Sequence, residues 1–386
     1  MKLLILTQKI DINDDLLGFF HSWVAELARH CEKIIVIALG VGQYRLPENV
    51  KVFSLGKEKN SILSFPPASP KLQRGERKRE SRIIDSGSGA GMTNNIFIKI
   101  KYIINFYKYI WSKRKNYDTV FVHMNQEYVI LGGFLWRLLG KKVTLWRNHQ
   151  VGGFWVRIAV WLSDVVFCTS QFAFVARYKK TRLMPAGIDT DFFWSDKKIQ
   201  PIKKSILYLG RLSPIKNIHV LLEAANLLDK ENVDFILNIV GEAGEKDGRY
   251  FEKLKSLARN LEQKDKIKFW GKEPFLKTPE IYNQNEIVVN LTNSGSFDKI
   301  ILEAMACEKP VLICNKSFLD ILPDDLSRVL FFEEGSAVDL KNKLKNFLGE
   351  PREMVIGERL REIVLKNHSL NFLSQRLRES LVSNKF

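Results

Sequence analysis

Short runs of apolar residues alternate with helical patterns along most of the chain, and this alternation restricts the possible folds more than any other feature. KLLILT (2–7), KIIVIAL (33–39) and TVFVH (119–123) are typical of buried strands. The segment 18–30, between the first two runs, has apolar residues at helical spacing. Strand–helix–strand order predicts parallel sheets with right-handed crossover connections. Because the same order restarts near residue 205, we expect an α/β protein of two doubly wound, Rossmann-like domains.

The division into domains follows from the point at which the alternation restarts. A chain of 386 residues is too long to fold around a single hydrophobic core of ordinary size. We expect an N-terminal domain over 1–190, a linker over 191–204 and a C-terminal domain over 205–368. A final amphipathic segment, 369–386, is expected to form a helix that crosses between the domains.

One segment, residues 66–93, interrupts the alternation. It contains several prolines, a basic run and a Gly/Ser-rich end without hydrophobic periodicity, which predicts a disordered basic insertion rather than a nucleic-acid-binding arm. The following segment, 96–117, is a predicted helix in which aromatic residues and isoleucines are mixed with lysines. Such a helix either packs in the core with a basic rim or rests its apolar face on an anionic bilayer.

The net charge and the cysteines indicate which partners and which cellular compartment suit the protein. Lys and Arg outnumber Asp and Glu by 60 to 43, so the net charge is +17. This charge suits a polyanion, an anionic membrane surface or an anionic substrate, but it is also typical of a generally basic proteome. The four cysteines form no CxxC pair, which favours free thiols in a reducing compartment. We find no signal peptide and no run of ~18 apolar residues, so we expect a cytoplasmic protein, with peripheral contact to the inner face of the membrane as an open alternative.

Two segments of the second half carry residues that suit a diphosphate. In SILYLGRLSPIKN an apolar run ends at Gly210 and Arg211, and Lys216 follows five residues after the arginine. In SGSFDKIILEAMA a polar turn leads into a helical pattern that contains Glu303. Cations at the carboxyl end of a strand and N–H groups at the start of a helix both attract phosphate. The glutamate, one turn further along, is placed to hold hydroxyls, and a diphosphate with a ribose describes a nucleotide.

These motifs resemble those of the family 4 glycosyltransferases, which have the GT-B fold of two Rossmann-like domains facing a cleft. The Gly-Arg-Leu segment with its later lysine resembles the motif that binds the donor diphosphate in that family. GSFDKIILEAMA resembles the family's EGFGLVLLEAMA, and PAGIDTDFF resembles its linker motif. The resemblance covers nearly all of the chain except 66–93. We interpret the GSFDK turn as the mark of a subgroup, in which Gly295 stands where the family has its first glutamate.

The resemblance also implies a set of site residues. His149 is expected to be the active-site histidine, and Arg211 and Lys216 are expected to stabilise the departing diphosphate. The expected donor-binding residues are Gly18, Gly210, Arg211, Lys216, Ser296, Phe297, Asp298, Lys299 and Glu303. In the family the first glutamate contacts the transferred sugar, so its replacement by Gly295 leaves the identity of that sugar open.

From the resemblance we expect a retaining, hexosyltransferase-type enzyme that moves a sugar from a nucleotide-diphosphate sugar to a lipid-linked or saccharide acceptor. Glycolipid or cell-surface polysaccharide assembly is the expected pathway. We expect no cofactor and no metal, because the DxD sequence that begins at Asp189 lies in the linker and not at a strand end. No nucleic-acid partner is expected. Two alternatives stay open: a nucleotide-sugar-binding protein without turnover, and an epimerase of the same fold.

Two positions have competing interpretations. Glu303 lies in an apolar helix with Cys307, not a cation, four residues later, and a buried glutamate without a partner is costly. A role in ligand binding is therefore favoured over a structural one. His123 either lines the acceptor cleft together with Asn125 and Glu127 or caps the sheet.

Overall fold

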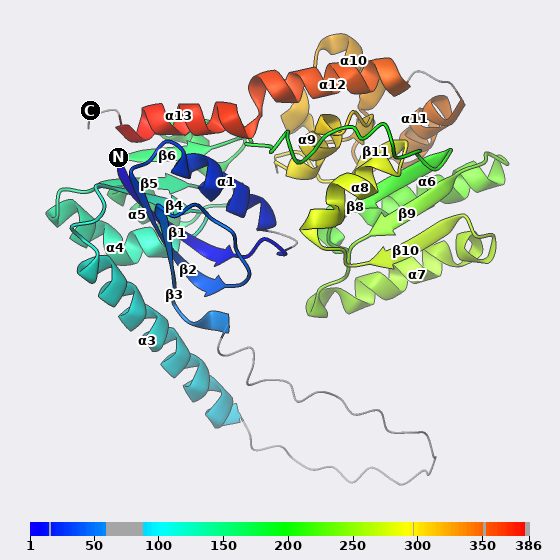
Figure 1. The fold of residues 1–386 in the computed structure, drawn as a ribbon. Coiled ribbons are helices and arrows are strands. Elements are labelled where there is room, and N and C mark those ends of the chain that lie inside the picture. The colour runs from blue at the N-terminus through cyan, green and yellow to red at the C-terminus, as the bar shows by residue number, and fades with distance from the viewer. Residues whose placement is uncertain (15–16, 59–87, 296, 350–352, 383–386) are drawn as a thin grey trace, which may run out of the picture.

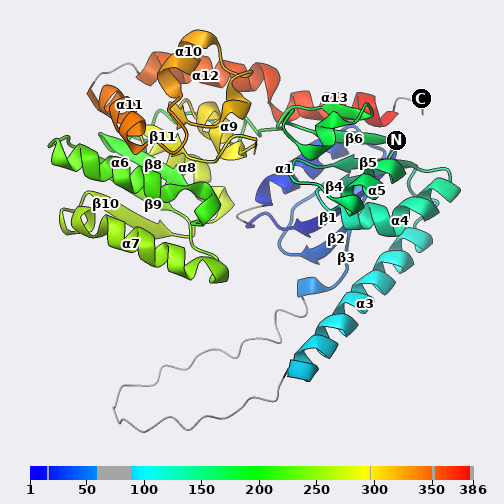
Figure 2. The ribbon, with the colours of Figure 1, turned by 180° about the vertical axis from the view of Figure 1, so that it is seen from behind.

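A computed structural model of the protein has two α/β domains side by side, each built around one parallel sheet (Figures 1 and 2). The structure describes residues 1–14, 17–58, 88–295, 297–349 and 353–382. The two sheets fall on either side of the segment expected to be the linker. The expected fold class, a GT-B arrangement of two doubly wound domains, is confirmed.

The N-terminal domain contains a seven-stranded parallel sheet in the order β3-β2-β1-β4-β5-β6-β7. Its strands are β1 (Lys2–Ile10), β2 (Lys33–Val41), β3 (Val50–Ser54), β4 (Thr119–His123), β5 (Lys142–Trp146), β6 (Val165–Cys168) and β7 (Thr181–Leu183). Its helices include α1 (Gly18–Ala28), α3 (Ser88–Ser112), α4 (Gln126–Leu138) and α5 (Phe154–Leu162). A strand of a parallel sheet is buried on both faces, so an uninterrupted run of apolar residues stabilises it there. The strands expected from such runs are present in this sheet.

The C-terminal domain repeats this plan with a five-stranded parallel sheet in the order β10-β9-β8-β11-β12. Its strands are β8 (Ser205–Leu209), β9 (Ile236–Val240), β10 (Ile267–Gly271), β11 (Ile287–Asn290) and β12 (Val311–Ile313). Its helices are α6 (Ile218–Lys230), α7 (Gly248–Gln263), α8 (Thr278–Asn283), α9 (Lys299–Ala306), α10 (Asp324–Leu330), α11 (Ala337–Gly349) and α12 (Glu353–Asn367). In both sheets the chain order reverses beside the first strand, so the two switch points lie between β1 and β4 and between β8 and β11.

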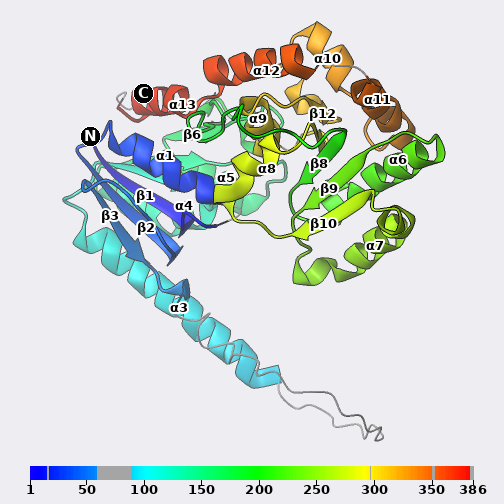
Figure 3. The ribbon, with the colours of Figure 1, turned by 45° about the vertical axis from the view of Figure 1, so that its right-hand side comes forward.

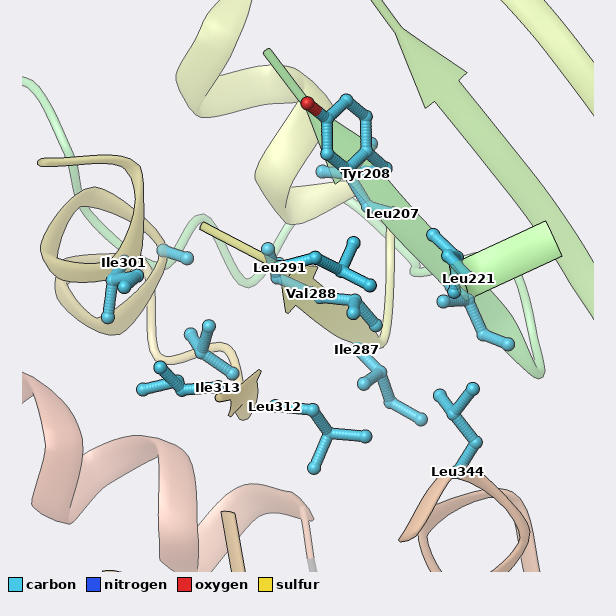
Figure 4. Close-up of a cluster of buried hydrophobic side chains, with 14 of the residues drawn as sticks. Leu207, Tyr208, Leu221, Ile287, Val288, Leu291, Ile301, Leu312, Ile313 and Leu344 are labelled. Carbon is cyan, nitrogen blue, oxygen red and sulfur yellow. The ribbon is translucent and has the colours of Figure 1, made fainter. Parts of the chain in front are cut away.

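The core of the C-terminal domain lies between the sheet and its covering helices. Figure 4 shows Leu207 of β8, Val288 of β11 and Leu312 of β12 in one buried cluster, with Ile301 of α9 and Leu344 of α11 against them. All five side chains are fully buried. This packing fixes the positions of β8 and α9, which precede or contain several of the expected donor-binding residues.

The C-terminal helix α13 (Leu370–Val382) returns to the N-terminal domain, whereas α12 lies over the C-terminal domain (Figure 1). Leu373, Leu377 and Leu381 of α13 are buried in the same cluster as Phe20 and Trp23 of α1. The crossing helix therefore holds the two domains together on the side away from α3.

The segment expected to be disordered needs a correction. Residues 59–87 lie outside the described residues, but residues 88–93 form the first part of α3. The helix expected over 96–117 thus begins at Ser88 and ends at Ser112. Ser and Gly are common at helix N-termini, so composition alone did not locate this boundary. Within the described residues, no helix is both long enough and apolar enough to cross a membrane.

Candidate functional site: a cavity between the two domains

A cavity of about 460 Å³ lies between the domains, at the carboxyl ends of strands from both sheets. The N-terminal domain contributes the start of α1 and residues at the ends of β4 and β5. The C-terminal domain contributes residues that follow β8 and β9 and the first turns of α9. Ligands of doubly wound domains bind at such carboxyl ends, beside the switch point of the sheet. A second cavity, of about 610 Å³ and lined by residues of α10, α11 and α12, contains none of the expected site residues.

The expected diphosphate motif lies at the switch point of the C-terminal sheet. Gly210 and Arg211 follow β8, and the turn that leads to α9 follows the neighbouring strand β11. Gly210 and Gly241 approach closely: a Cβ atom on Gly241, which has φ +134°, would lie 2.0 Å from the carbonyl oxygen of Gly210. Both glycines line the cavity, so a ligand can reach the backbone here. Arg211 is exposed on the cavity wall and forms no ion pair within the described residues.

Lys216 also lines the cavity, but its ammonium group is held by the protein. Its Nζ lies 2.5 Å from Oδ2 of Asp298 and 3.1 Å from Oγ1 of Thr292. The same carboxylate accepts hydrogen bonds from Nδ2 of Asn290 at 3.1 Å and from Thr292 at 2.9 Å. Burial alone would raise the pKa of Asp298, but Lys216 and these hydrogen bonds bring it below its usual value. The lysine and the aspartate therefore form an internal ion pair at the site.

Asp298 also sets the start of α9. It is the N-cap residue, and its Oδ1 accepts a hydrogen bond from the N–H of Ile300 at 3.4 Å. Phe297, just before it, lines the cavity and stacks on Phe318 with ring centroids 4.7 Å apart. Ser296 lies outside the described residues. Phe297 and Asp298 are thus held by contacts within the C-terminal domain.

Lys299 and Glu303 lie one helical turn apart on α9, and both line the cavity. Nζ of Lys299 lies 3.6 Å from the ring centroid of Phe19 and 4.1 Å from that of Trp23. Both aromatic residues belong to α1, which Figure 3 shows beside the C-terminal domain. This Nζ is buried and has no hydrogen-bond partner among the described residues. Burial lowers the pKa of Lys299 well below its usual value, although the carboxylate of Glu303 acts in the opposite direction.

The structure corrects the view that Glu303 lacks a partner. Its Oε2 accepts a hydrogen bond from the hydroxyl of Tyr282 at 3.1 Å, and Lys299, four residues earlier, interacts with its charge. Burial raises the pKa of Glu303, while Lys299 and the tyrosine hydroxyl oppose that shift. The argument for a ligand role from an unpaired glutamate was therefore wrong. The position of Glu303 in the cavity wall is the observation that still supports a role in ligand binding.

His149 and Gly18 do not line the cavity. His149 follows β5 and is exposed, and its Nδ1 accepts a hydrogen bond from the N–H of Val151 at 3.0 Å. Gly18 is the first residue of α1 and contacts Phe275 of a short 3-10 helix, η4 (Phe275–Lys277), in the other domain. The neighbours Leu17 and Phe19 line the cavity instead.

The N-terminal wall of the cavity was largely missed from the sequence. Trp23 and Trp146 line it together with His123, which stacks on Phe20 with ring centroids 3.9 Å apart. Burial, with a smaller effect of Lys299, lowers the pKa of His123 well below its usual value, so this imidazole is neutral. Of the two alternatives for His123, the structure shows that its side chain lines the cavity between the domains. Asn125 and Glu127, expected to accompany it, are not part of the cavity wall.

A side chain at position 295 would strain the backbone and displace the end of Gln150. Its φ is +94°, and a Cβ atom would lie 1.8 Å from Nε2 of Gln150 in the N-terminal domain. Gln150 donates a hydrogen bond from this nitrogen to the carbonyl oxygen of Ser294 at 2.8 Å. An interdomain contact thus occupies the place where the resembling family carries its first glutamate.

Within the described residues, no group of three or more His, Cys, Asp or Glu side chains could hold a metal ion.

Part of the chain is similar to a known protein family and to several curated proteins. Residues 191–362 match the family model of the glycosyl transferases group 1. The chain is 26% identical over 166 residues to a D-inositol 3-phosphate glycosyltransferase of Segniliparus rotundus, covering 41% of the chain and 37% of that protein. It is 26% identical over 242 residues to an alpha-monoglucosyldiacylglycerol synthase of Streptococcus pneumoniae, covering 58% and 54%. The chain thus spans only about a third to a half of these two relatives.

Solved structures with the same fold include complexes with nucleotides. HepE of Anabaena in complex with UDP superimposes over the whole of both chains with a TM-score of 0.72 and 17% identity. The same protein with UDP-glucose gives a TM-score of 0.72 at 15% identity. The crystal structure of TarM gives a TM-score of 0.72 at 11% identity over 99% of each chain. These structures show that the chain has the GT-B fold, and residues 191–362 are similar to the glycosyl transferases group 1.

Proposed function

We propose that the protein is a glycosyltransferase that takes a sugar from a nucleoside-diphosphate sugar held by the C-terminal domain. The observation that carries this proposal is the convergence of Arg211, the start of α9 and Glu303 on one cavity at the switch point of the sheet. The match of residues 191–362 to the glycosyl transferases group 1 and the fold shared with UDP-bound HepE support it. We also propose that the GSFDK turn marks a subgroup of these enzymes.

The proposed role of the cations is to stabilise the departing diphosphate. Negative charge grows on the leaving group as the bond to the sugar breaks, and a fixed cation in a cavity of low polarity is effective there. Arg211 is suited to this role because its guanidinium is exposed on the wall and unpaired within the described residues. The sugar would be transferred with retention of configuration, assisted by an oxygen of the leaving phosphate. We propose no metal and no cofactor for this step.

An exposed apolar face on the N-terminal domain supports a lipid-linked acceptor. We define the apolar face as the exposed large apolar side chains of α3, α4 and α5: Phe97, Ile100, Ile104, Trp111, Phe134, Leu138, Phe154, Trp155 and Trp161. The three helices are neighbours (Figure 2). The Tyr107 hydroxyl of α3 donates to the carbonyl of Leu131 in α4 at 2.8 Å, and Arg137 of α4 donates to the carbonyl of Trp161 in α5 at 2.8 Å.

Cations on the same helices favour an anionic bilayer as the partner of the apolar face. Lys99, Lys101, Lys108 and Arg157 are exposed beside its apolar side chains. Exposed apolar patches of this kind mark interaction sites, and basic side chains beside them select surfaces of anionic lipid. We therefore propose that the protein lies peripherally on a membrane, with the apolar face in the headgroup region, and takes its acceptor from that membrane. The structure of α3 thus favours the membrane alternative for its solvent-facing side.

A donor screen tests the proposed function. Purified protein is incubated with UDP-, GDP-, ADP- and TDP-sugars, with and without a lipid extract, and free nucleoside diphosphate is measured. Release from one donor that rises with lipid supports the transferase. Tight donor binding without release would favour the nucleotide-sugar-binding protein, and conversion of the donor sugar to an epimer would favour the epimerase. The anomeric configuration of the product, determined by NMR, tests retention.

A further inference from the structure

The charged residues that line the cavity all lie on one side of it. Its basic lining residues, Arg211, Lys216, Lys272 and Lys299, belong to the C-terminal domain, and so do its acidic lining residues. The described lining residues of the N-terminal domain include no Asp, Glu, Lys or Arg. The wall proposed for the donor can therefore match the charges of a nucleoside diphosphate, whereas the described part of the opposite wall carries no charged side chain.

The N-terminal wall is mostly apolar. Its residues Trp23, His123 and Trp146 are buried, and His123 is neutral because burial lowers its pKa well below the usual value. The surface that a ligand can reach is therefore provided mainly by the other described residues of this wall, which are Leu17, Phe19, Met124 and Asn148. Apolar side chains and one amide suit C–H groups and hydroxyls. A phosphate or a carboxylate at this wall would lose its hydration without gaining a counter-charge.

Lys299 of the opposite wall does not supply that counter-charge. Its Nζ lies 3.6 Å from the ring centroid of Phe19, but this atom is buried, so neither water nor an anion at the N-terminal wall reaches it. The carboxylate of Glu303, on the same helix, compensates part of its charge. A group bound against the N-terminal wall thus contacts apolar surface and not an ammonium group.

Met124 is the most exposed described residue of the N-terminal wall, at 37%. It lies between β4 and α4 with a φ of +67°, where a residue with a side chain is strained. The N–H of Asn125 donates to the carbonyl of His123 at 2.9 Å across it, which closes a γ-turn of the rare, strained kind. Such strain is typical of binding sites, and a glycine would avoid it. The exposed, strained side chain therefore indicates a contact with a ligand.

We propose that the N-terminal wall binds the accepting end of the acceptor, with Met124 in contact with it, and that this end is an uncharged alcohol. The unit that carries the attacking hydroxyl, a sugar ring or a glyceride, then has no phosphate or carboxylate of its own. Any phosphate further along a carrier lipid lies outside this wall. This inference rests on the proposed function and adds the charge class of the acceptor.

The transfer step that this arrangement serves is balanced without a further reactant. The hydroxyl oxygen of the acceptor forms a bond to C1 of the donor sugar, while the bond from C1 to the diphosphate oxygen breaks. The proton of the hydroxyl passes to the departing diphosphate. An apolar wall beside the hydroxyl keeps water away from C1, and water is the competing acceptor.

The first test identifies the unit that receives the sugar. Wild-type protein is incubated with the lipid extract and with the donor that passes the screen, labelled in its sugar. The labelled product is isolated, and mass spectrometry of its fragments with methylation analysis identifies the unit to which the new sugar is linked. We expect an uncharged sugar ring or a glycerol unit. A new bond to a phosphorylated ring, such as an inositol phosphate, or to a uronic acid would refute the inference and leave the transferase standing.

The second test removes the side chain of Met124. Met124→Gly suits a positive φ, and Asp265→Gly, its matched control, makes the same kind of change at φ +55° in the exposed turn between α7 and β10, away from the cavity wall. We expect Met124→Gly to raise the amount of extract needed for half the maximal rate about tenfold, because the apolar contact of the thioether is lost. The Kd of the donor and the melting temperature should change little. Asp265→Gly should leave the acceptor requirement and the Kd of the donor unchanged.

The results separate this inference from the proposed function. An acceptor requirement that is unchanged in Met124→Gly and in Met124→Asn, which also tolerates a positive φ, would refute the contact with Met124. A loss of donor affinity in both variants, with an unchanged acceptor requirement, would assign the wall to the donor and likewise refute the inference. If no donor released its nucleoside diphosphate in the presence of the extract, the proposed function would be contradicted, and the inference with it.

Discussion

Removing two tryptophans from the apolar face tests its proposed contact with a bilayer. Trp155 and Trp161 of α5 are 61% and 65% exposed, although tryptophan is seldom so accessible. A tryptophan side chain of about 250 Å² exposed to this extent leaves roughly 150 Å² in water. At about 25 cal/mol per Å², full burial would contribute about 4 kcal/mol per residue. Shallow insertion into the headgroup region would realise about half of this, so each Trp→Ser substitution should weaken binding about thirtyfold.

The assay is cosedimentation with vesicles of phosphatidylcholine, alone or mixed with phosphatidylglycerol, at low and high salt. We expect the wild type to bind the mixed vesicles and to release as salt rises, because the lysines of α3 contribute electrostatically. Trp155→Ser and Trp161→Ser should each lower the partition coefficient with little change in melting temperature. Trp194→Ser, at a 46% exposed tryptophan of the linker, is the matched control.

Two results would refute the reasoning about the apolar face. One is a wild-type protein that does not bind the anionic vesicles at low salt. The other is unchanged binding in both α5 variants, which would mean that these side chains remain in water when the protein is bound. Self-association of the wild type that the same substitutions abolish would instead assign the face to a second copy of the chain.

Three further substitutions and one chelation experiment have expected outcomes. Arg211→Ala should abolish sugar transfer without changing the urea midpoint, whereas wild-type turnover would contradict the diphosphate assignment. Gly295→Glu should lower both the melting temperature and the rate of transfer, because φ at this position is +94° and the new side chain displaces the end of Gln150; an unchanged melting temperature would contradict this reasoning. Asp229→Asn should cost about 1–2 kcal/mol of unfolding free energy at pH 7, because two lysines lower the pKa of Asp229 to about 2. Since this pKa is depressed, the difference in urea stability should persist above pH 4 and disappear as the pH falls to 2. EDTA should not inhibit transfer, and recovery of lost activity by manganese after chelation would overturn the metal-free proposal.

The sheets could be predicted from the sequence because their physical requirement is local. A parallel strand buried on both faces needs an uninterrupted apolar run, such as KIIVIAL in β2, and such runs are visible without knowledge of contacts. The start of α3 could not be predicted in the same way. Its first residues, which begin at Ser88, lack the apolar spacing that signals a helix, and tertiary context decides whether such a stretch continues one.

Within the site, contacts between residues far apart in the sequence could not be predicted from the sequence alone. Lys216 and Asp298 are 82 positions apart, and they meet because β8 and β11 are neighbours in the sheet. By contrast, the interaction of Lys299 with Glu303 has a local signal, since residues four apart share one face of a helix. This signal lies on the N-terminal side of Glu303, because Lys299 precedes it by four residues. His149 was assigned by resemblance alone, and the structure places it outside the cavity wall.

Three of the four departures from the family turn, at Gly295, Asp298 and Lys299, can be explained from the structure. Gly295 gives up a carboxylate, and the positive φ at this position lets Gln150 close the turn against the N-terminal domain. Asp298 brings a carboxylate back three residues later, but it is used to cap α9 and to hold Lys216. Lys299 adds an amino group that has no hydrogen-bond partner among the described residues and lies in the cavity wall. Replacing Asp298 alone by the family's glycine would leave the ammonium group of Lys216 without its carboxylate partner. Position 298 should therefore tolerate that glycine only when Lys216 is changed with it.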